Sequence, residues 1–438
     1  MSKINIPRMV WIGALILFAL RAAIIILWGS NQPPDITDHE VYYKNAILLL
    51  SGWEQWIRPG SEFGYRAPLF FVYLAGAHAL TGSDSFQISQ LASALVGTAV
   101  CIMAFVVARS LAGDRAGYIA FWLRGLLPNY LISDTYAMSE QMFALVLLSV
   151  LAVVAAAAAR PQTRHAVVIG ALLGTGMLVR EAGLVYPLIF LTYLVLTHGS
   201  LKERGGRALA CIAMLLVVLS PWLARNHFVW GHAMPIGYTA GPGLHAGNNP
   251  EFEGAWKWPP SPPNSIQFGT PEFEHWHREQ AIEYIKQDPI AFLQRGFVKV
   301  AWFLFPRFHR YDLKIVYPSL DKIIQPLSIT IGATGAIMLL LGVISFTASR
   351  IDSYWWTCLG VISIVVAAIV ATGGDPRYRD PVDHILLIAT AVFAGTTWRF
   401  RDGLVGILQQ PRPKLVLMLL SYAAILFSWI WVAVDKST

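Results

Sequence analysis

The sequence predicts an all-α polytopic membrane protein, and three observations support that fold class. Of the 438 residues, 55% are hydrophobic and only 13% are charged, whereas about one quarter of an ordinary soluble domain is charged. Apolar runs of about 20 residues, the length that crosses a bilayer, recur along the chain. Lysines and arginines concentrate in short loops between alternate runs, so the net charge of +7 reflects topology and does not indicate nucleic-acid binding.

Eleven apolar runs are predicted to span the membrane. The first begins after a short basic segment, but it is too long for a signal peptide and no clear cleavage site follows it, so we expect it to be retained. The three cysteines lie inside apolar runs without ligand spacing, which predicts neither a disulfide framework nor a zinc site. The predicted spans are 9–29, 87–109, 116–133, 140–159, 165–179, 182–198, 208–224, 326–347, 354–371, 382–397 and 415–433.

The run 67–82 decides the topology, because counting it as a span would invert everything after it. If it lies on the membrane surface inside one external segment, 30–86, every short basic loop falls on the cytoplasmic side, as the positive-inside rule requires. We therefore expect an interfacial helix at 67–82, a cytoplasmic N-terminus and an inner-membrane protein. The chain then divides into an N-terminal membrane module, a long external loop and C-terminal spans: 1–226, 227–325 and 326–438.

The long external loop is predicted to be partly helical and functional, because long connections without structure are uncommon. Its segment 270–305 has a helical pattern that ends in an apolar stretch suited to the membrane surface. External histidines leave a divalent metal open, although no pair has firm ligand spacing and no cofactor is firmly implied. These are His39, His227, His232, His245, His275 and His277.

The first external segment contains the pattern D-x3-Y-x3-A-x2-L-x2-G from Asp38 to Gly52. This spacing places Asp38 and Tyr42 on one helical face. The acid stands at the helix start, where the helix dipole favours its ionised form. An acid that simply caps a surface helix is the alternative reading.

Taken with six further motifs, this pattern resembles the GT-C glycosyltransferases. The likeness is greatest to the bacterial branch near the protein mannosyltransferases of glycosyltransferase family 39 and to relatives that modify lipid A or lipopolysaccharide core. The resemblance implies a sugar donor on a polyprenyl phosphate and an external active site. It also implies an envelope acceptor (lipid, glycan or protein) and an acid on the first external loop. The motifs are "RAPL" 66–69, "MSEQMF" 138–143, "LVREAG" 178–183, "PWLARN" 221–226, "GLHAGNNPEFEG" 243–254 and "RYRDP" 377–381.

The resemblance assigns the acids of the site. Asp38 corresponds to the loop acid and is expected to be the general base of an inverting transfer, with Glu40 as second choice. Glu140, at the start of a span, is expected to position hydroxyl groups or hold a metal. A helix-start acid without a catalytic role is the alternative for Glu140.

Transfer from a phosphate-linked sugar also requires cations at the leaving phosphate, and the guanidinium fork suits phosphate oxygens. External arginines matching the motifs are the candidates, with snorkelling to headgroups or pairing with an acid as the alternatives. Arg21 and Arg124 lie inside spans, where charges are usually paired or functional. Two asparagines suit sugar hydroxyls or a turn. The predicted substrate-binding residues are Tyr42, Arg66, Arg180, Arg225, Asn248, Asn249, Arg377 and Tyr378.

Two other functions fit parts of the pattern. A glycan polymerase or ligase with a diphosphate-linked donor would share the external arginines. A transporter or flippase fits less well, because polar residues gather in external loops and no paired half-repeats are seen.

Overall fold

The computed structural model describes most of the chain. The described residues are 6–35, 37–52, 54–57, 63, 66–158, 160–234, 239–252, 258–263, 265–306, 310–348, 352–397 and 412–435. Four basic residues that contribute to the predicted sidedness lie outside them: Lys3, Arg350, Arg399 and Arg401.

The described residues form helices joined by turns and loops. The first half of the chain holds α1 Arg8–Trp28, α2 Asp38–Ser51, α3 Glu54–Ile57, α4 Leu69–Thr81, α5 Phe86–Leu126, α6 Pro128–Ser133, α7 Glu140–Ala157, α8 Thr163–Val179, the 3-10 turn η2 Glu181–Val185, α9 Tyr186–Leu196 and α10 Leu201–Trp230. The second half holds α11 Ala240–Asn248, α12 Pro271–Gln287, α13 Pro289–Leu304, α14 Arg310–Val316, η3 Pro318–Leu320, α15 Asp321–Ala348, α16 Ser353–Ala371, η4 Pro376–Arg379, α17 Asp380–Thr396 and α19 Arg412–Asp435.

The eleven predicted spans all fall on helices. Seven described helices are long and apolar enough to cross a membrane, and shorter apolar helices account for the predicted spans at 165–179 and 182–198. The predicted spans 87–109 and 116–133 both fall largely on α5. Its backbone leaves the helical region at Ala112 and Gly113 (φ +83°), so α5 is two helical arms joined at a sharp turn. Glycine suits that turn because it tolerates positive φ.

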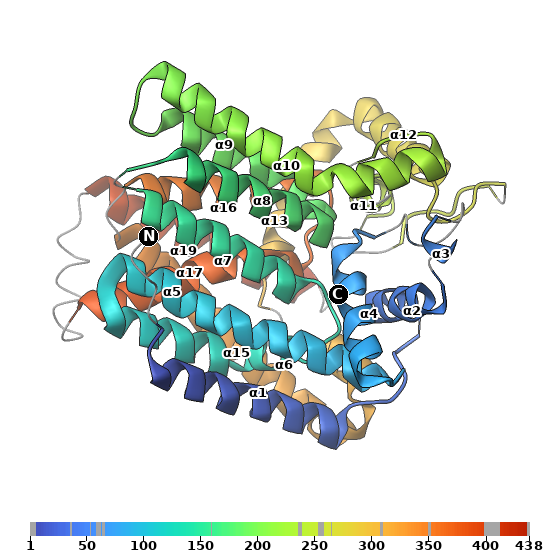
Figure 1. Cartoon of the computed structure of the whole chain (residues 1–438), viewed down its shortest axis with the longest axis horizontal. Coiled ribbons are helices and arrows are strands. Elements are labelled where there is room, and N and C mark those ends of the chain that lie inside the picture. The colour runs from blue at the N-terminus through green and yellow to red at the C-terminus, as the bar shows by residue number, and fades with distance from the viewer. Residues whose placement is uncertain are drawn as a thin grey trace.

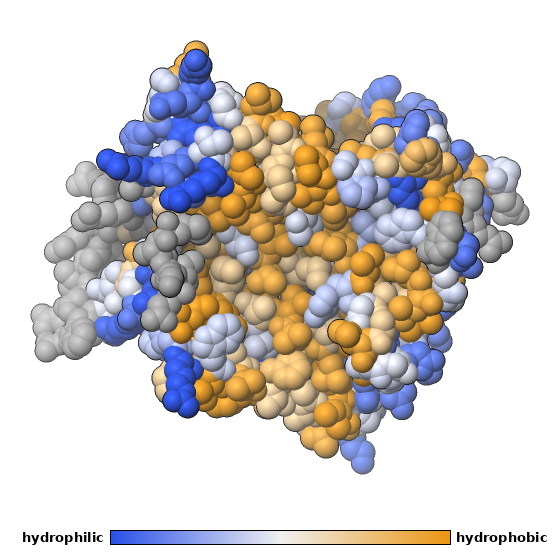
Figure 2. Space-filling model, viewed as in Figure 1, coloured by the Kyte–Doolittle hydropathy of each residue, from blue (hydrophilic) through white to orange (hydrophobic). Residues whose placement is uncertain are grey.

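The helices form one bundle with a hydrophobic middle and polar ends. In Figure 1, α1, α5, α7, α8 and α10 run side by side, and α2, α3, α4, α11 and α12 gather at one end. The N-terminus lies at the opposite end. Figure 2 shows hydrophobic residues across the middle of this face and hydrophilic residues towards both ends. The chain is therefore a polytopic helical membrane protein, as predicted.

Two predicted features of the polar end are observed with changed boundaries. The run 67–82 forms a short helix, α4, which packs against α2 and α5. The helical segment 270–305 is interrupted at Asp288, because Pro289 lacks the N–H that would continue α12. The Asp288 side chain accepts a hydrogen bond from the Ala291 N–H and so begins α13 as a new helix.

Close packing of α8 on α10 fixes the bundle beneath the polar end. A Cβ at Gly170 would lie 2.2 Å from the carbonyl oxygen of Cys211, so only glycine permits this approach. The largest core cluster draws on α5, α7, α8, α9, α10, α16 and α17. This core supports α7, α8 and α10, whereas α2 and α4 pack in a separate cluster that includes Tyr42, Phe70 and Phe71.

Candidate active site

Asp38 is the first residue of α2 and faces the centre of the polar end. Thr37 caps the helix, with its hydroxyl accepting a hydrogen bond from the Glu40 N–H at 3.4 Å. Tyr42, one turn further on, is buried. The spacing predicted from the sequence therefore does place Asp38 and Tyr42 on one helical face, with the carboxylate at the positive end of the helix dipole.

Two arginines from distant parts of the chain bind the two oxygens of this carboxylate. Arg66 donates to Oδ1, and Arg377 donates to Oδ2 at 2.8 Å. The three side chains are 17% to 25% exposed, so the triad is sheltered yet reachable. Burial alone would raise the pKa of Asp38, but Arg66 and Arg377 hold it well below its ordinary value. Asp38 is therefore an ionised carboxylate held by two cations.

A second ion pair lies beside this triad. Arg180, at the C-terminal end of α8, pairs with Glu140 at 2.7 Å. Its guanidinium also donates to the Ser139 hydroxyl at 3.3 Å, and that hydroxyl hydrogen-bonds the Tyr42 hydroxyl at 2.9 Å. Tyr42 therefore connects the helix of Asp38 to the Glu140–Arg180 pair through Ser139.

The turn that carries Arg66 is fixed by an acid outside the predicted set. The Glu181 carboxylate accepts a hydrogen bond of 2.7 Å from the backbone N–H of Ala67, which is buried. The neighbouring residues Arg180 and Glu181 thus serve different parts of the site. Arg180 pairs with the acid of α7 rather than with Glu181.

A pocket opens next to these pairs. It encloses about 400 Å³ of space, including open solvent, between the start of α7, the end of α6 and the turn η4–α17. Three carboxylates and one guanidinium line it, so it offers acceptors for hydroxyl groups and, at Arg377, one site for a negative charge. Its lining residues are Asn129, Ser133, Tyr136, Met138, Glu140, Gln141, Pro376, Arg377, Asp380 and Asp383.

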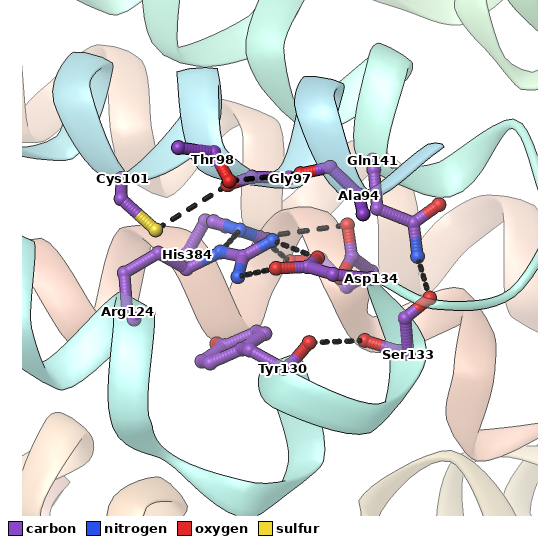
Figure 3. Close-up of polar contacts among 12 residues, drawn as sticks. Ala94, Gly97, Thr98, Cys101, Arg124, Tyr130, Ser133, Asp134, Gln141 and His384 are labelled. Carbon is purple, nitrogen blue, oxygen red and sulfur yellow. Dashed lines mark hydrogen bonds and ion pairs between the residues drawn. The ribbon is translucent and has the colours of Figure 1, made fainter. Parts of the chain in front are cut away.

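A buried charge network underlies the pocket (Figure 3). Asp134 accepts hydrogen bonds from Arg21 at 2.6 Å and from both terminal nitrogens of Arg124 at 2.7 and 2.8 Å. Arg124 also donates to His384 at 2.9 Å and lies over the ring of Tyr130. This network ties α1, α5 and α17 to the segment that leads into Glu140, and it supplies partners for both in-span arginines.

Two further predicted residues, Arg225 and Tyr378, make ring contacts with neighbouring side chains. Arg225 is buried against Trp56 and Trp222, and its Nε donates to the Trp56 carbonyl at 2.9 Å. Tyr378 lies against the Arg377 guanidinium, 5.3 Å from ring centre to Cζ. A substrate contact for either one stays a prediction.

The two asparagines predicted to bind sugar have their amides engaged within the fold. Asn248 donates to the carbonyls of Leu244 and Ala371 and accepts from Lys299 at 3.0 Å. Asn249 donates to two carbonyls of α11 and accepts from the Glu251 N–H at 2.9 Å, as a turn residue does. Sugar binding by these residues stays a prediction, because both amides already have structural partners.

Besides Glu181, sequence reasoning missed Ser139, Asp134 and His384, which connect the site. Ser139 stands within the "MSEQMF" motif, so its position next to Glu140 was a usable signal. Asp134 and His384 gave no such signal, because the network joins Asp134 to Arg21, 113 residues away, and His384 to Arg124, 260 residues away. Gly97 leaves room for the Asp134 carboxylate, since a Cβ at that position would lie 2.3 Å from Cγ of Asp134.

The residues at the site do not fit a metal centre. Both oxygens of Asp38 are bound by arginines, and Glu140 pairs with Arg180. Within the part of the chain that the structure describes, no group of three or more His, Cys, Asp or Glu side chains is arranged to hold a metal ion. The chemistry below therefore has no step that depends on a metal.

Comparison with known proteins shows what this chain is similar to. Residues 65–224 match the family described as dolichyl-phosphate-mannose-protein mannosyltransferase, and no curated protein sequence matches the chain. The fold is shared with the oligosaccharyltransferase of Archaeoglobus fulgidus in its apo form (TM-score 0.52, 12% identity), over 98% of this chain and 56% of that one. It is shared with ArnT of Cupriavidus metallidurans bound to undecaprenyl phosphate (TM-score 0.53, 15% identity), over 94% of this chain and 63% of that one.

The chain thus spans less than two thirds of the length of either solved protein. The family match covers the segment that carries Arg66, Glu140 and Arg180. The fold match extends over nearly the whole chain. Together these findings show that part of the chain is similar to the mannosyltransferase family and that nearly all of it shares the fold of these two solved proteins.

Proposed function

We propose that the protein transfers a sugar from a polyprenyl-phosphate donor to a hydroxyl group of an envelope acceptor at the external face of the inner membrane. The observation that carries the proposal is the Asp38 carboxylate held between Arg66 and Arg377, because Arg377 also lines the adjoining pocket. A base and phosphate-binding cations are the two functions that such a transfer needs. The bound undecaprenyl phosphate in the similar ArnT structure supports a lipid-phosphate ligand.

In the proposed reaction, Asp38 accepts the proton of the acceptor hydroxyl while that oxygen attacks the anomeric carbon. The bond from that carbon to the phosphate oxygen breaks, and the electron pair stays on the polyprenyl phosphate. Attack from the side opposite the phosphate inverts the configuration. Negative charge builds on the phosphate as the bond breaks, so a guanidinium there stabilises the transition state more than the ground state.

Within this proposal, the ion pairs of Asp38 with Arg66 and Arg377 make the activity of the base depend on donor binding. A base with a strongly lowered pKa accepts a proton poorly. When a donor phosphate binds, Arg66 and Arg377 share their N–H groups with its oxygens, so their hold on Asp38 weakens. The carboxylate pKa then rises towards its ordinary value. Donor binding would thereby activate the base, and Asp38 would act only when the phosphate is in place.

We propose that the lipid tail of the donor lies along a second, shallow pocket. This pocket adjoins the first through the shared residues Asn129 and Asp383 and covers about 310 Å³ of space, including open solvent, between α6, α15 and α17. Its lining is mostly apolar, which suits an isoprenoid chain whose phosphate lies near Arg377. The lining residues are Leu127, Asn129, Tyr130, Thr334, Gly335, Met338, Leu339, Asp383 and Leu386.

Gly335 allows this path to be tested. A Cβ there would meet no atom within 4 Å, so position 335 tolerates a side chain, and Gly335→Trp is designed to fill the groove. We expect that variant to impair donors with a long polyprenyl chain and to spare a donor with a two-isoprene chain. Ile337→Trp, on the exposed face of the same helix, is the matched control. An equal loss of activity with both donor lengths would show that the lipid tail does not lie in this groove.

The function itself is tested with purified protein in lipid nanodiscs. A panel of undecaprenyl-phosphate pentoses and hexoses is supplied with an extract of envelope lipids and glycans, and release of undecaprenyl phosphate is measured. We expect release that depends on both donor and acceptor, with the product of inverted anomeric configuration. Release only from undecaprenyl-diphosphate donors would instead identify a polymerase or ligase. Movement of donor across a sealed membrane without transfer would identify a flippase.

A further inference from the structure

The segment 370–379, which carries Arg377 to Asp38, is held at both ends by α13. At its start, the Lys299 amine donates to the Val370 carbonyl at 2.8 Å. At its end, the Arg379 guanidinium donates to two carbonyls at the C-terminal end of α13, at 2.8 and 3.0 Å. The segment therefore cannot move relative to α13 without breaking hydrogen bonds.

Lys299 also caps the end of α16. The last four carbonyls of a helix have no partner within it. The Lys299 amine satisfies that of Val370, and the Asn248 amide satisfies that of Ala371 at 2.7 Å. The Asn248 oxygen in turn accepts from the Lys299 amine at 3.0 Å. A cation at this position also suits the negative end of the helix dipole.

Backbone segments around this cap are in close contact with one another. A Cβ at Gly247 of α11 would lie 1.3 Å from the Thr372 carbonyl oxygen, and one at Gly374 would lie 2.2 Å from the Lys299 carbonyl oxygen. Contacts between backbones transmit a shift directly, because no flexible side chain lies between them to absorb it. Displacing the cap therefore displaces the turn that leads into Arg377.

Packing alone does not explain a lysine here. Its side chain is fully buried, and none of the described acids pairs with it. Burial, and secondarily the Arg295 charge, lowers its pKa to about 7. A buried amine without an acid is costly to the fold, so an apolar residue of the same length would serve stability better. The neutral amine still has two N–H donors, so both hydrogen bonds survive deprotonation.

We infer that Lys299 is a positioning residue for Arg377: together with Asn248 it fixes the end of α16 and thereby sets where the Arg377 guanidinium meets the donor phosphate. This inference rests on the proposed function, in which Arg377 binds that phosphate. In this inference, two residues of the long external loop, Asn248 and Lys299, align the guanidinium of Arg377, which lies on the C-terminal segment. A misplacement of about 1 Å at a reacting group can cost about 100-fold in rate.

A double-mutant cycle tests whether Lys299 acts through Arg377. Lys299→Met keeps the length of the side chain and removes the amine, and Lys299→Gln keeps one donor should the methionine variant fold poorly. We expect Lys299→Met to lower kcat/KM for release of undecaprenyl phosphate by about 10- to 100-fold. In an Arg377→Ala background the same change should cost less than about twofold, because the group it positions is gone. A full additional loss in that background would overturn the inference.

Hydrogen exchange provides a readout that does not depend on activity. Peptides covering 372–379 should exchange faster in Lys299→Met than in the wild type, and peptides from α7 should be unchanged. Lys286→Gln, on the exposed end of α12, is the control and should alter neither exchange nor rate. Unchanged exchange at 372–379 would overturn the inference. If exchange rises but Arg377→Ala retains full activity, Lys299 does hold the segment, and it is the phosphate role of Arg377 that fails.

Discussion

Replacing Asp38 by asparagine should lower turnover and strengthen phosphate binding at the same time. Loss of a general base costs about 10²- to 10⁴-fold in rate. The same change removes the negative charge that both Arg66 and Arg377 bind, so their guanidinium groups would then face a donor phosphate without that competitor. Most substitutions in a binding site weaken both turnover and ligand binding. A variant with slower turnover and tighter phosphate binding would therefore be distinctive.

The gain in binding can be estimated from the geometry. The Arg377 nitrogen lies 2.8 Å from the Asp38 oxygen, and Asp38 is 20% exposed. A phosphate on the far side of the same guanidinium would lie about 6 Å from the carboxylate. Two unit charges at about 6 Å, with an effective dielectric constant of about 40, repel by about 1.4 kcal/mol, which is about tenfold in affinity. Asparagine removes this repulsion.

The assay measures binding of undecaprenyl phosphate to protein in nanodiscs, together with release of that product from a sugar donor. Glu40→Gln is the matched control, because it makes the same charge change two residues away, where Glu40 pairs with the exposed Lys44 at 2.6 Å. We expect the control to leave the rate within about twofold. Weaker phosphate binding by Asp38→Asn, or turnover close to that of the wild type, would refute the assignment of Asp38 as the base.

Three further predictions concern single side chains. Arg377→Lys keeps the charge but loses the paired donors, so release of undecaprenyl phosphate should fall at least about tenfold; an unchanged rate would make this arginine an interfacial anchor. Asp134→Asn leaves Arg21 and Arg124 buried without their carboxylate and should cost about 3–5 kcal/mol, seen as a lower unfolding temperature and poor yield; a wild-type unfolding temperature would contradict this. Lys299 has a pKa of about 7 in the fold and about 10.4 when unfolded. Between these values the unfolded chain binds more protons, so stability should rise with pH. The unfolding temperature should increase more from pH 6.5 to pH 9 in the wild type than in Lys299→Met, and equal increases would count against the lowered pKa.

The sequence predicted the helices well because hydrophobicity is read from neighbouring residues. It located the apolar runs that form the long helices, and the short helix α4 as well. The position of α4 at the membrane surface stays a prediction. It did not predict that two spans would join at Ala112 and Gly113, since that depends on the backbone conformation of a single turn. The break at Asp288 was equally local but was missed, although Pro289 is a visible signal for it.

The site was predictable only where a motif contained the residue itself. Asp38, Arg66 and Arg377 were all singled out, and the structure brings them together. Their partnership was not predicted, because the three positions are separated by up to 339 residues. Arg225 shows the opposite case, since its motif and sidedness suggested the same site but its contacts are with tryptophans. Sequence patterns predict which residues are polar and at which depth, whereas packing decides which of them meet.

The buried pair of Arg21 and Asp134 constrains the order in which the protein can be assembled in the membrane. Arg21 lies in the first helix, and its carboxylate partner is synthesised 113 residues later. Until then the helix must enter the bilayer with an unpaired guanidinium, which costs about 2.5–3.5 kcal/mol at the centre of a span. The remainder of α1 is strongly apolar, with a mean hydropathy of 2.6, and offsets that cost during insertion. We therefore expect α1 to remain beside the insertion machinery until the second arm of α5 and Asp134 have been synthesised and Asp134 can pair with Arg21.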